Sequence, residues 1–236
     1  MESRARRPGL DTLRGLALVS MMAYHAAWDL VYLFGADWPW YRSAGAFFWQ
    51  QSICWTFILL SGYCFALGRH PLRRGGITFG AGAVVTAVTL LFMPDQPILF
   101  GVLTFLGSAA VLTVPLDRFL QRIPAGAGLA GSFALFWLLR WVSRGTAGPW
   151  TLPEGWYANL FTAFLGFPPE GFVSSDYFSL LPWLFLFWTG YFLYRLHPGP
   201  FCRGRAVIPG VTWLGRHSLL IYLLHQPVLY GLVTLL

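Results

Sequence analysis

Residues 44–67 read AGAFFWQQSICWTFILLSGYCFAL, a run of 24 residues without an Asp, Glu, Lys, Arg or His. A helix of about 20 predominantly apolar residues crosses the roughly 30 Å hydrocarbon layer of a bilayer. Similar stretches recur along the chain, and only 11% of its residues are charged, against about 25% in an ordinary soluble domain. The sequence therefore predicts an all-α, polytopic transmembrane helix bundle, and the long apolar runs disfavour a β-barrel.

The arginine distribution predicts the topology of about seven spans. The expected spans are Gly15–Leu33, Ala44–Leu67, Ile77–Met93, Ile98–Leu116, Ala125–Trp141, Tyr177–Leu196 and Ser218–Leu236. With the N-terminus inside and the C-terminus outside, only Arg42, Arg140 and Arg144 of the sixteen basic residues lie outside, which agrees with the positive-inside rule. The third and fifth spans are short or Gly-rich, so six or eight crossings stay open.

The polar breaks argue for one domain over residues 1–236. The outer break, residues 142–176, is much longer than the others, and its Pro, Gly and aromatic residues suit either an interfacial lid or a plain interfacial loop. The net charge of +7 is carried entirely by Arg in the breaks, which indicates membrane orientation instead of nucleic-acid binding. We expect an integral protein of a bacterial cytoplasmic (inner) membrane, in contact with its lipids.

The first span carries ionisable groups on one face. Arg14 follows the segment Leu10-Asp11-Thr12-Leu13, and His25 lies eleven residues later, about 16 Å along the axis and only about 20° away in azimuth. Asp29 follows His25 by four residues, so its carboxylate can orient the imidazole and raise its basicity. This is the geometry of a general base; the alternative is a histidine paired only for helix packing.

The last span has a second polar face, made of Ser218, Tyr222 and His225 and followed by Gln226 and Pro227. The rise per residue places His225 at a depth similar to that of His25, so the two imidazoles can meet. Gln50 and Gln51 of the second span can complete a polar cluster. Each of these side chains alone is also compatible with an ordinary interhelical hydrogen bond.

Three further charged residues lie at helix entrances. Arg14 and Arg216, on the cytoplasmic side, can bind the phosphates of a soluble cofactor or anchor to lipid headgroups. Asp176, at the outer entrance of the sixth span, can contact an acceptor or serve as a helix cap.

The chain resembles the catalytic domain family of heparan-alpha-glucosaminide N-acetyltransferase. Four segments carry the resemblance: LDTLRG at 10–15 with the downstream His25, ILFGVL at 98–103, DYFSLLPW at 176–183, and LGRHSLLIYLLHQP at 214–227. The resemblance implies acyl transfer from cytosolic acetyl-coenzyme A to an acceptor such as a terminal amino sugar, with His25 at the position of the active histidine and Arg14 holding the cofactor's phosphates. The eukaryotic enzyme is larger, so its acceptor does not transfer directly.

The leading hypothesis is a membrane-embedded, acetyl-CoA-dependent N- or O-acyltransferase whose catalytic residues are His25 and Asp29. The first alternative is a bis-histidine haem electron carrier ligated by His25 and His225. The second is a non-catalytic transporter or scaffold. The expected partners are acetyl-CoA and a glycan or amino-sugar acceptor, with no metal and no nucleic acid; acceptor identity and homo-oligomerisation stay open.

Overall fold

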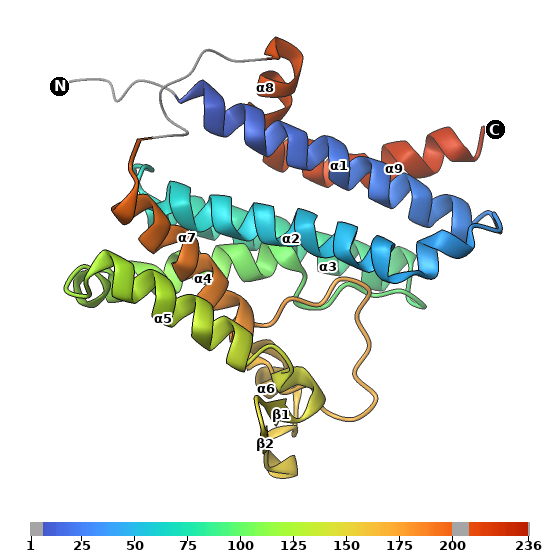
Figure 1. Cartoon of the computed structure of the whole chain (residues 1–236). Coiled ribbons are helices and arrows are strands. Elements are labelled where there is room, and N and C mark those ends of the chain that lie inside the picture. The colour runs from blue at the N-terminus through green and yellow to red at the C-terminus, as the bar shows by residue number, and fades with distance from the viewer. Residues whose placement is uncertain (1–6, 200–207, 236) are drawn as a thin grey trace. The chain divides into compact units, whose positions relative to one another are not determined.

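The structure is a computed structural model, and it describes residues 7–199 and 208–235 (Figure 1). The chain forms two compact units. The first comprises residues 1–60 and 197–236, and the second comprises residues 61–196. Of the arginines in the predicted topology, Arg4, Arg6, Arg203 and Arg205 lie outside the described residues.

The first unit is built around a long helix, α1 (Pro8–Tyr32), which begins with a proline whose fixed φ suits a first helical turn. It also contains the turn η1 (Pro39–Arg42), most of α2 (Ala44–Phe65), α8 (Pro209–Arg216) and α9 (Ser218–Val233). Helices α8 and α9 both pack along α1 (Figure 1). The N-terminal helix and the two C-terminal helices thus pack together in one unit.

Small residues allow α1 and α8 to approach closely. A Cβ atom added at Gly15 would lie 1.9 Å from the carbonyl oxygen of Val211, and one added at Gly215 would lie 1.8 Å from that of Asp11. Between these points the buried hydroxyls of Thr12 and Thr212 share a 2.7 Å hydrogen bond. Small-residue contacts and hydrogen bonds of this kind hold helices together in lipid, where no hydrophobic force drives their association.

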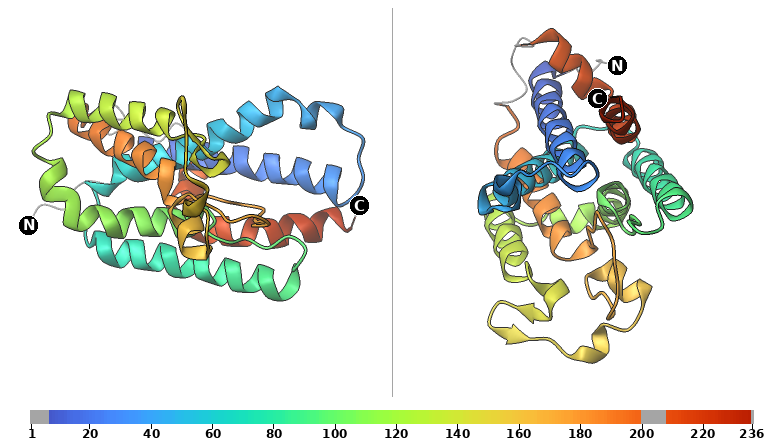
Figure 2. Two further views of the ribbon diagram at one scale, coloured as in Figure 1. Left: turned by 90° about the horizontal axis from the view of Figure 1, so that it is seen from below. Right: turned by 90° about the vertical axis from the view of Figure 1, so that its right-hand side faces the viewer.

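The second unit pairs α3 (Pro71–Phe92) with α4 (Val102–Leu120), and α5 (Ala125–Leu138) with α7 (Leu180–Leu196) (Figure 2). Glycine again sets the spacing, because a Cβ atom at Gly107 would lie 2.4 Å from the backbone nitrogen of Phe79. A Cβ atom at Gly128 of α5 would contact the ring of Phe192. In the two weaker predicted spans, Gly82 and Gly128 are therefore helix-packing positions, whereas a Cβ atom added at Gly80, Gly126 or Gly131 would meet no atom within 4 Å.

The long segment between α5 and α7 is folded and contains five short elements. They are η2 (Val142–Arg144), the antiparallel strands β1 (Thr146–Ala147) and β2 (Trp150–Thr151), η3 (Glu154–Trp156) and α6 (Leu160–Leu165) (Figure 1). Asn159 begins α6 with a capping box. The hydroxyls of Tyr157 and Tyr177 donate to the carbonyls of Val142 and Ala163, which ties the segment to itself. Its role as a lid stays a prediction.

The helical fold class is confirmed, and each of the seven predicted spans coincides with a helix. Among the described residues, three stretches are long and apolar enough to cross a membrane: Pro71–Phe92, Val102–Leu120 and Ala125–Arg144. Ser218–Val233 is a shorter apolar helix. The count of seven crossings and their orientation stay predictions. The short helix α8 was not expected, since the sequence analysis treated its residues as a break.

Candidate active site

One end of the first unit carries a charged cluster around Asp11. The Nη1 atom of Arg14 lies 3.3 Å from Oδ1 of Asp11, and Nε of Arg216 lies 3.6 Å from Oδ2. The close α1–α8 contact at Gly15 and Gly215 brings the two guanidinium groups to the same carboxylate. Two cations around one anion leave a net positive charge, and all three side chains retain some exposure, so the cluster can also bind an external anion.

Farther along α1, His25 meets His225 of α9. Their ring centroids lie 4.9 Å apart with the planes at 59°, so the prediction that the two imidazoles meet is confirmed. His225 is buried, and its Nδ1 atom bonds the carbonyl oxygen of Tyr222. Because a carbonyl only accepts, Nδ1 must carry the proton, and Nε2 of the neutral ring is left with a free lone pair.

The spacing of the two rings is unfavourable for the haem alternative. Two imidazoles that bind one metal ion from opposite sides have their coordinating nitrogens about 4 Å apart, since each metal–nitrogen bond is about 2 Å long. Their ring centroids then lie farther apart than the 4.9 Å found between His25 and His225. The arrangement is instead two imidazole rings in direct contact.

Asp29 and Gln226 form a buried pair beside the histidines. Asp29 is 0% exposed, and its Oδ1 atom accepts a 2.6 Å hydrogen bond from Nε2 of Gln226. In the part of the chain that the structure describes, no ion pair or hydrogen bond joins Asp29 to His25. The carboxylate therefore bonds α9, instead of orienting the His25 ring directly as the sequence analysis expected.

Three buried atoms of this cluster have no hydrogen-bond partner within the described residues: Oδ2 of Asp29, Nε2 of His225 and Oε1 of Gln226. The first and third can only accept hydrogen bonds, and the tautomer of His225 makes its Nε2 an acceptor as well. An unsatisfied buried polar atom costs about 1–3 kcal/mol. Such a set of acceptors suits a bound group that donates hydrogen bonds, such as an amine or a hydroxyl.

The remaining predicted residues lie in different places. Tyr222 lies beside His225, with ring centroids 5.3 Å apart. Gln51 accepts a 3.3 Å hydrogen bond from the indole of Trp55, and Gln50 is exposed. Asp176 belongs to the second unit.

Asp176 is a helix cap in this structure. Its Oδ2 atom accepts a 3.0 Å hydrogen bond from the backbone nitrogen of Val102, at the start of α4. From the sequence, Asp176 could cap the sixth span, which it directly precedes. In the structure it caps α4 instead. Burial raises the pKa of this carboxyl above its ordinary value, and the hydrogen bond from Val102 opposes that shift.

A groove of about 200 Å³ lies along residues 13–20 of α1, and neither Arg14 nor His25 lines it. It is lined by Leu13, Leu16, Ala17, Ser20, Ser52, Ile53 and Thr56, from α1 and α2. The indole nitrogen of Trp49 donates to Ser20 across the same two helices, at 2.9 Å. The groove has mainly apolar walls and a few hydroxyls, so it can hold a slender, weakly polar chain. The groove could not be predicted from the sequence, because its shape depends on how α1 and α2 pack.

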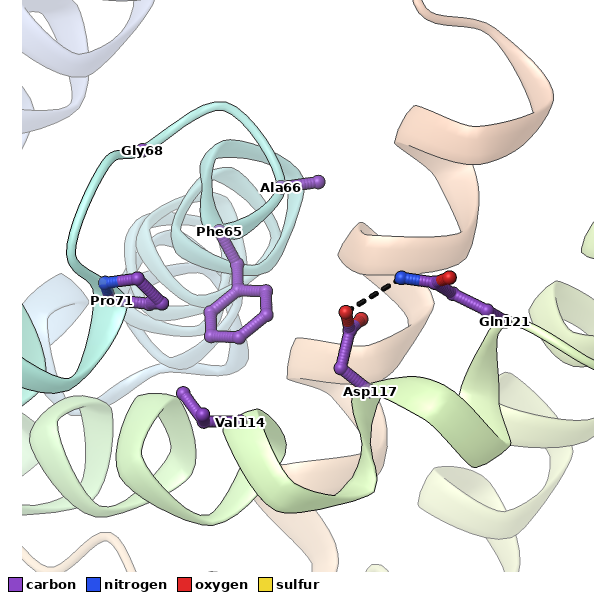
Figure 3. Close-up of a pocket in the computed structure, with 7 residues that line it drawn as sticks. All are labelled: Phe65, Ala66, Gly68, Pro71, Val114, Asp117 and Gln121. Carbon is purple, nitrogen blue, oxygen red and sulfur yellow. Dashed lines mark hydrogen bonds between the residues drawn. The ribbon is translucent and has the colours of Figure 1, made fainter.

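The second unit has a separate cavity of about 220 Å³, lined by Phe65, Ala66, Gly68, Pro71, Val114, Asp117 and Gln121 (Figure 3). Inside it the amide of Gln121 donates to the carboxylate of Asp117 at 2.6 Å, and the hydroxyl of Tyr191 donates to the other oxygen of Asp117. None of the residues predicted for the site lines this cavity.

Comparison with known proteins identifies one family. The sequence model of the family described as heparan-alpha-glucosaminide N-acetyltransferase, catalytic, matches residues 6–227, which is nearly the whole chain. Neither a curated protein nor a solved structure gives a significant match. The matched residues include α1, α8 and the part of α9 that carries His225 and Gln226.

Proposed function

The chain belongs to the heparan-alpha-glucosaminide N-acetyltransferase catalytic family, and from this premise we propose that it is a membrane-embedded acyltransferase. In this proposal it moves an acetyl group from cytosolic acetyl-coenzyme A to an amine or hydroxyl of a glycan or amino sugar. The observation that carries the proposal is the contact between His25 and His225 beside three buried acceptor atoms. A site with several hydrogen-bond acceptor atoms and two imidazole rings suits a nucleophile that must lose a proton.

In this proposal the first unit binds acetyl-coenzyme A. Arg14 and Arg216 bind the phosphates of coenzyme A at the charged end of α1. The pantetheine chain extends from Arg14 toward His25 along the face of α1 that these two residues share. Acetyl-coenzyme A supplies the acetyl group as an activated thioester.

His25 acts as the general base. The acceptor's N–H or O–H donates to the imidazole, and the proton moves to His25 as the acceptor forms its bond to the acetyl carbon. The carbon–sulfur bond breaks, and the proton on His25 goes to the departing thiolate. The buried carboxylate of Asp29 stabilises the transient positive charge, and when the acceptor is an amine, Nε2 of His225 accepts a hydrogen bond from its second N–H.

A thioester-consumption assay in proteoliposomes tests this function. Purified protein, acetyl-coenzyme A on the cytoplasmic side and a panel of amino sugars on the other should yield free thiol and an acetylated sugar. His70→Asn is a matched control, since His70 is exposed in the second unit and its φ of 54° is one that asparagine tolerates. Coenzyme A binding without transfer to any sugar or hydroxyl acceptor would contradict the proposal.

A further inference from the structure

We propose that the cavity of the second unit binds a phosphoethanolamine group, an ester that carries one phosphate and one primary ammonium group. The cavity lies among the turn after α2, the start of α3 and the end of α4 (Figure 3). No residue assigned to acyl transfer lines it, so this site goes beyond the proposed function. In a membrane, the phosphoethanolamine group is the headgroup of phosphatidylethanolamine.

The position of the cavity along α3 and α4 suits a lipid headgroup. Both helices are long and apolar enough to cross a membrane. They pack antiparallel, since Cβ atoms added at Gly75 and Gly82 of α3 would meet Ala110 and Thr104 of α4 in that order. The cavity lies where α3 begins and α4 ends, which is one membrane surface whichever way the pair is oriented. Exposed arginines gather at the same end, as is typical of segments that face headgroups: Arg69, Arg73, Arg74, Arg118 and Arg122.

Asp117 supplies a fixed negative charge in one wall of the cavity. The hydroxyl of Tyr191 donates to its Oδ1 atom and Nε2 of Gln121 donates to its Oδ2 atom, both at 2.6 Å. These two donors carry no charge, and each carboxylate oxygen can accept one further hydrogen bond. Among the described residues, Asp117 belongs to no ion pair. A carboxylate that is oriented in advance and still charged suits the ammonium group of a ligand.

Arg195 of α7 lies near this carboxylate but does not pair with it. Its guanidinium instead donates three hydrogen bonds to carbonyl oxygens at the C-terminal end of α4, those of Leu120, Gln121 and Ile123. Arginine commonly satisfies the last carbonyls of a helix in this way. The negative charge of Asp117 is therefore left for a ligand.

Arg74 supplies a positive charge on the other side of the cavity. A Cβ atom added at Gly68 would lie 1.7 Å from Nη1 of Arg74, so the guanidinium packs directly on this wall residue. Figure 3 shows Gly68 and Pro71 on the side of the cavity away from Asp117. Within residues 7–199 and 208–235, no ion pair joins Arg74 to Asp117. A cation and an anion held apart across a cavity match the phosphate and the ammonium of one zwitterion.

The charges and the size of the cavity distinguish this headgroup from others. Arginines alone would suit any anionic lipid, but Asp117 repels a headgroup whose only charge is negative. The ammonium of a choline headgroup has no N–H to donate to the carboxylate. Phe65 and Val114 give the two methylene groups between the charges an apolar surface. The volume of about 220 Å³ equals roughly seven water molecules at about 30 Å³ each, which is enough for this small ester.

Binding of lipids with identical acyl chains tests the ammonium site. In native mass spectrometry of the detergent-purified protein, phosphatidylethanolamine should bind about 10-fold tighter than phosphatidylcholine or phosphatidylglycerol, because only it can donate hydrogen bonds from a cation to Asp117. Asp117→Asn should abolish this preference. Asp95→Asn is the matched control, since Asp95 is exposed in the connection at the other end of α3 and α4. Equal binding of the ethanolamine and choline lipids, or an unchanged preference in Asp117→Asn, would overturn the proposal.

A second pair of variants tests the phosphate site without touching Asp117. Arg74→Gln should weaken binding of phosphatidylethanolamine by about 5-fold or more, and Gly68→Ala should weaken it too, because the new Cβ displaces the guanidinium while the charge is kept. Arg73→Gln is the control, since Arg73 is the exposed neighbour of Arg74 on α3. Thermal unfolding verifies that each variant is folded. An equal loss from Arg73→Gln would assign the effect to the general basic surface and contradict the site.

Competition with soluble compounds identifies the source of the group. Free phosphoethanolamine should displace the lipid, and inorganic phosphate should displace it far less, since it lacks the ammonium. Displacement only at concentrations far above that of the lipid supports the membrane as the source, whereas displacement at similar concentrations supports the site with a soluble ester as its occupant. No displacement, or equal displacement by inorganic phosphate, would show that the two charges are not recognised together and would overturn the proposal.

Discussion

His25 was predicted from the helix spacing, contacts His225 and lies within the residues that the family model matches. If it is the general base, His25→Ala should leave the protein folded and able to bind coenzyme A, yet lower acetyl transfer by roughly 10²-fold or more. Asp29→Asn should give an intermediate rate, because the imidazole remains while the buried negative charge is lost. Near-parental turnover of His25→Ala on an identified acceptor would refute this mechanism.

The Asp29–Gln226 hydrogen bond should be worth more to stability than an exposed one. Gln226→Leu removes the donor to a carboxylate that is 0% exposed, and we expect it to lower the free energy of unfolding by about 1–3 kcal/mol. The double variant Asp29→Leu/Gln226→Leu should be less destabilised than the sum of the single variants, since it leaves neither group unpaired. Thermal unfolding in detergent measures all three. Strictly additive losses would show that the pair is not coupled.

The sequence predicted which residues meet in the candidate site better than it predicted the hydrogen-bond partner of each. The contact of His25 with His225 followed from the rise of two helices, which is a backbone property. The partner of Asp29 did not follow, because the choice between His25 and Gln226 depends on side-chain rotamers and on the rotation of α9. Both predictions about Arg14 and Arg216 concerned an external anion, and neither anticipated their shared contact with Asp11.

The close packing of α1 against α8 depends on two glycines, Gly15 and Gly215, which have no side chain at the crossing. Gly15→Ala should destabilise the protein by about 1–3 kcal/mol and weaken coenzyme A binding, because the new Cβ would clash with the backbone of Val211 and separate Arg14 from Arg216. Gly210→Ala is the control, since its added Cβ would meet no atom within 4 Å. Arg14→Ala should weaken coenzyme A binding without the loss of stability. Gly15→Ala with parental stability would argue against the close crossing.

Helix α4 should show a pH-dependent cap. Asp176 accepts from the backbone of Val102, so Asp176→Ala should cost about 0.5–2 kcal/mol, while asparagine can still accept this bond. Burial raises the pKa of Asp176 in the folded protein above its ordinary value of 3.8. The folded state then binds more protons than the unfolded state, and this contribution to stability is lost as pH rises from about 4 toward the raised pKa.

Thermal unfolding in detergent between pH 4 and pH 7 checks this prediction. The parent should lose stability relative to Asp176→Asn as the pH rises through that range, since the amide does not titrate. An opposite slope, with the parent gaining on Asp176→Asn, would mean that the bond from Val102 outweighs burial. The capped helix was beyond sequence reasoning because Asp176 and Val102 lie 74 residues apart and meet only through tertiary packing.

For the whole molecule, the helices could be predicted from the sequence, whereas the number of membrane crossings has to be measured. Apolar length alone predicted seven helices, but within residues 7–199 and 208–235 only three stretches are long and apolar enough to span a membrane by themselves. Helix α1 falls below that standard partly because it carries Asp11, Arg14, His25 and Asp29, the polar residues that the proposed function needs. A membrane-spanning helix that carries polar site residues has a lower mean hydropathy. A hydropathy threshold therefore undercounts the spans of such a protein.

Reporter fusions decide the topology that the arginine asymmetry predicts. Fusions after Arg74, Arg122 and Arg205 should all report the cytoplasm, and a fusion after Arg144 should report the outside. The reason is that short loops rich in arginine are retained on the cytoplasmic side. This predicted orientation would put Arg14 on the side where cytosolic acetyl-coenzyme A is available and η1 on the opposite side. External signals at two of the three cytoplasmic positions would contradict the seven-span topology and the direction proposed for acetyl transfer.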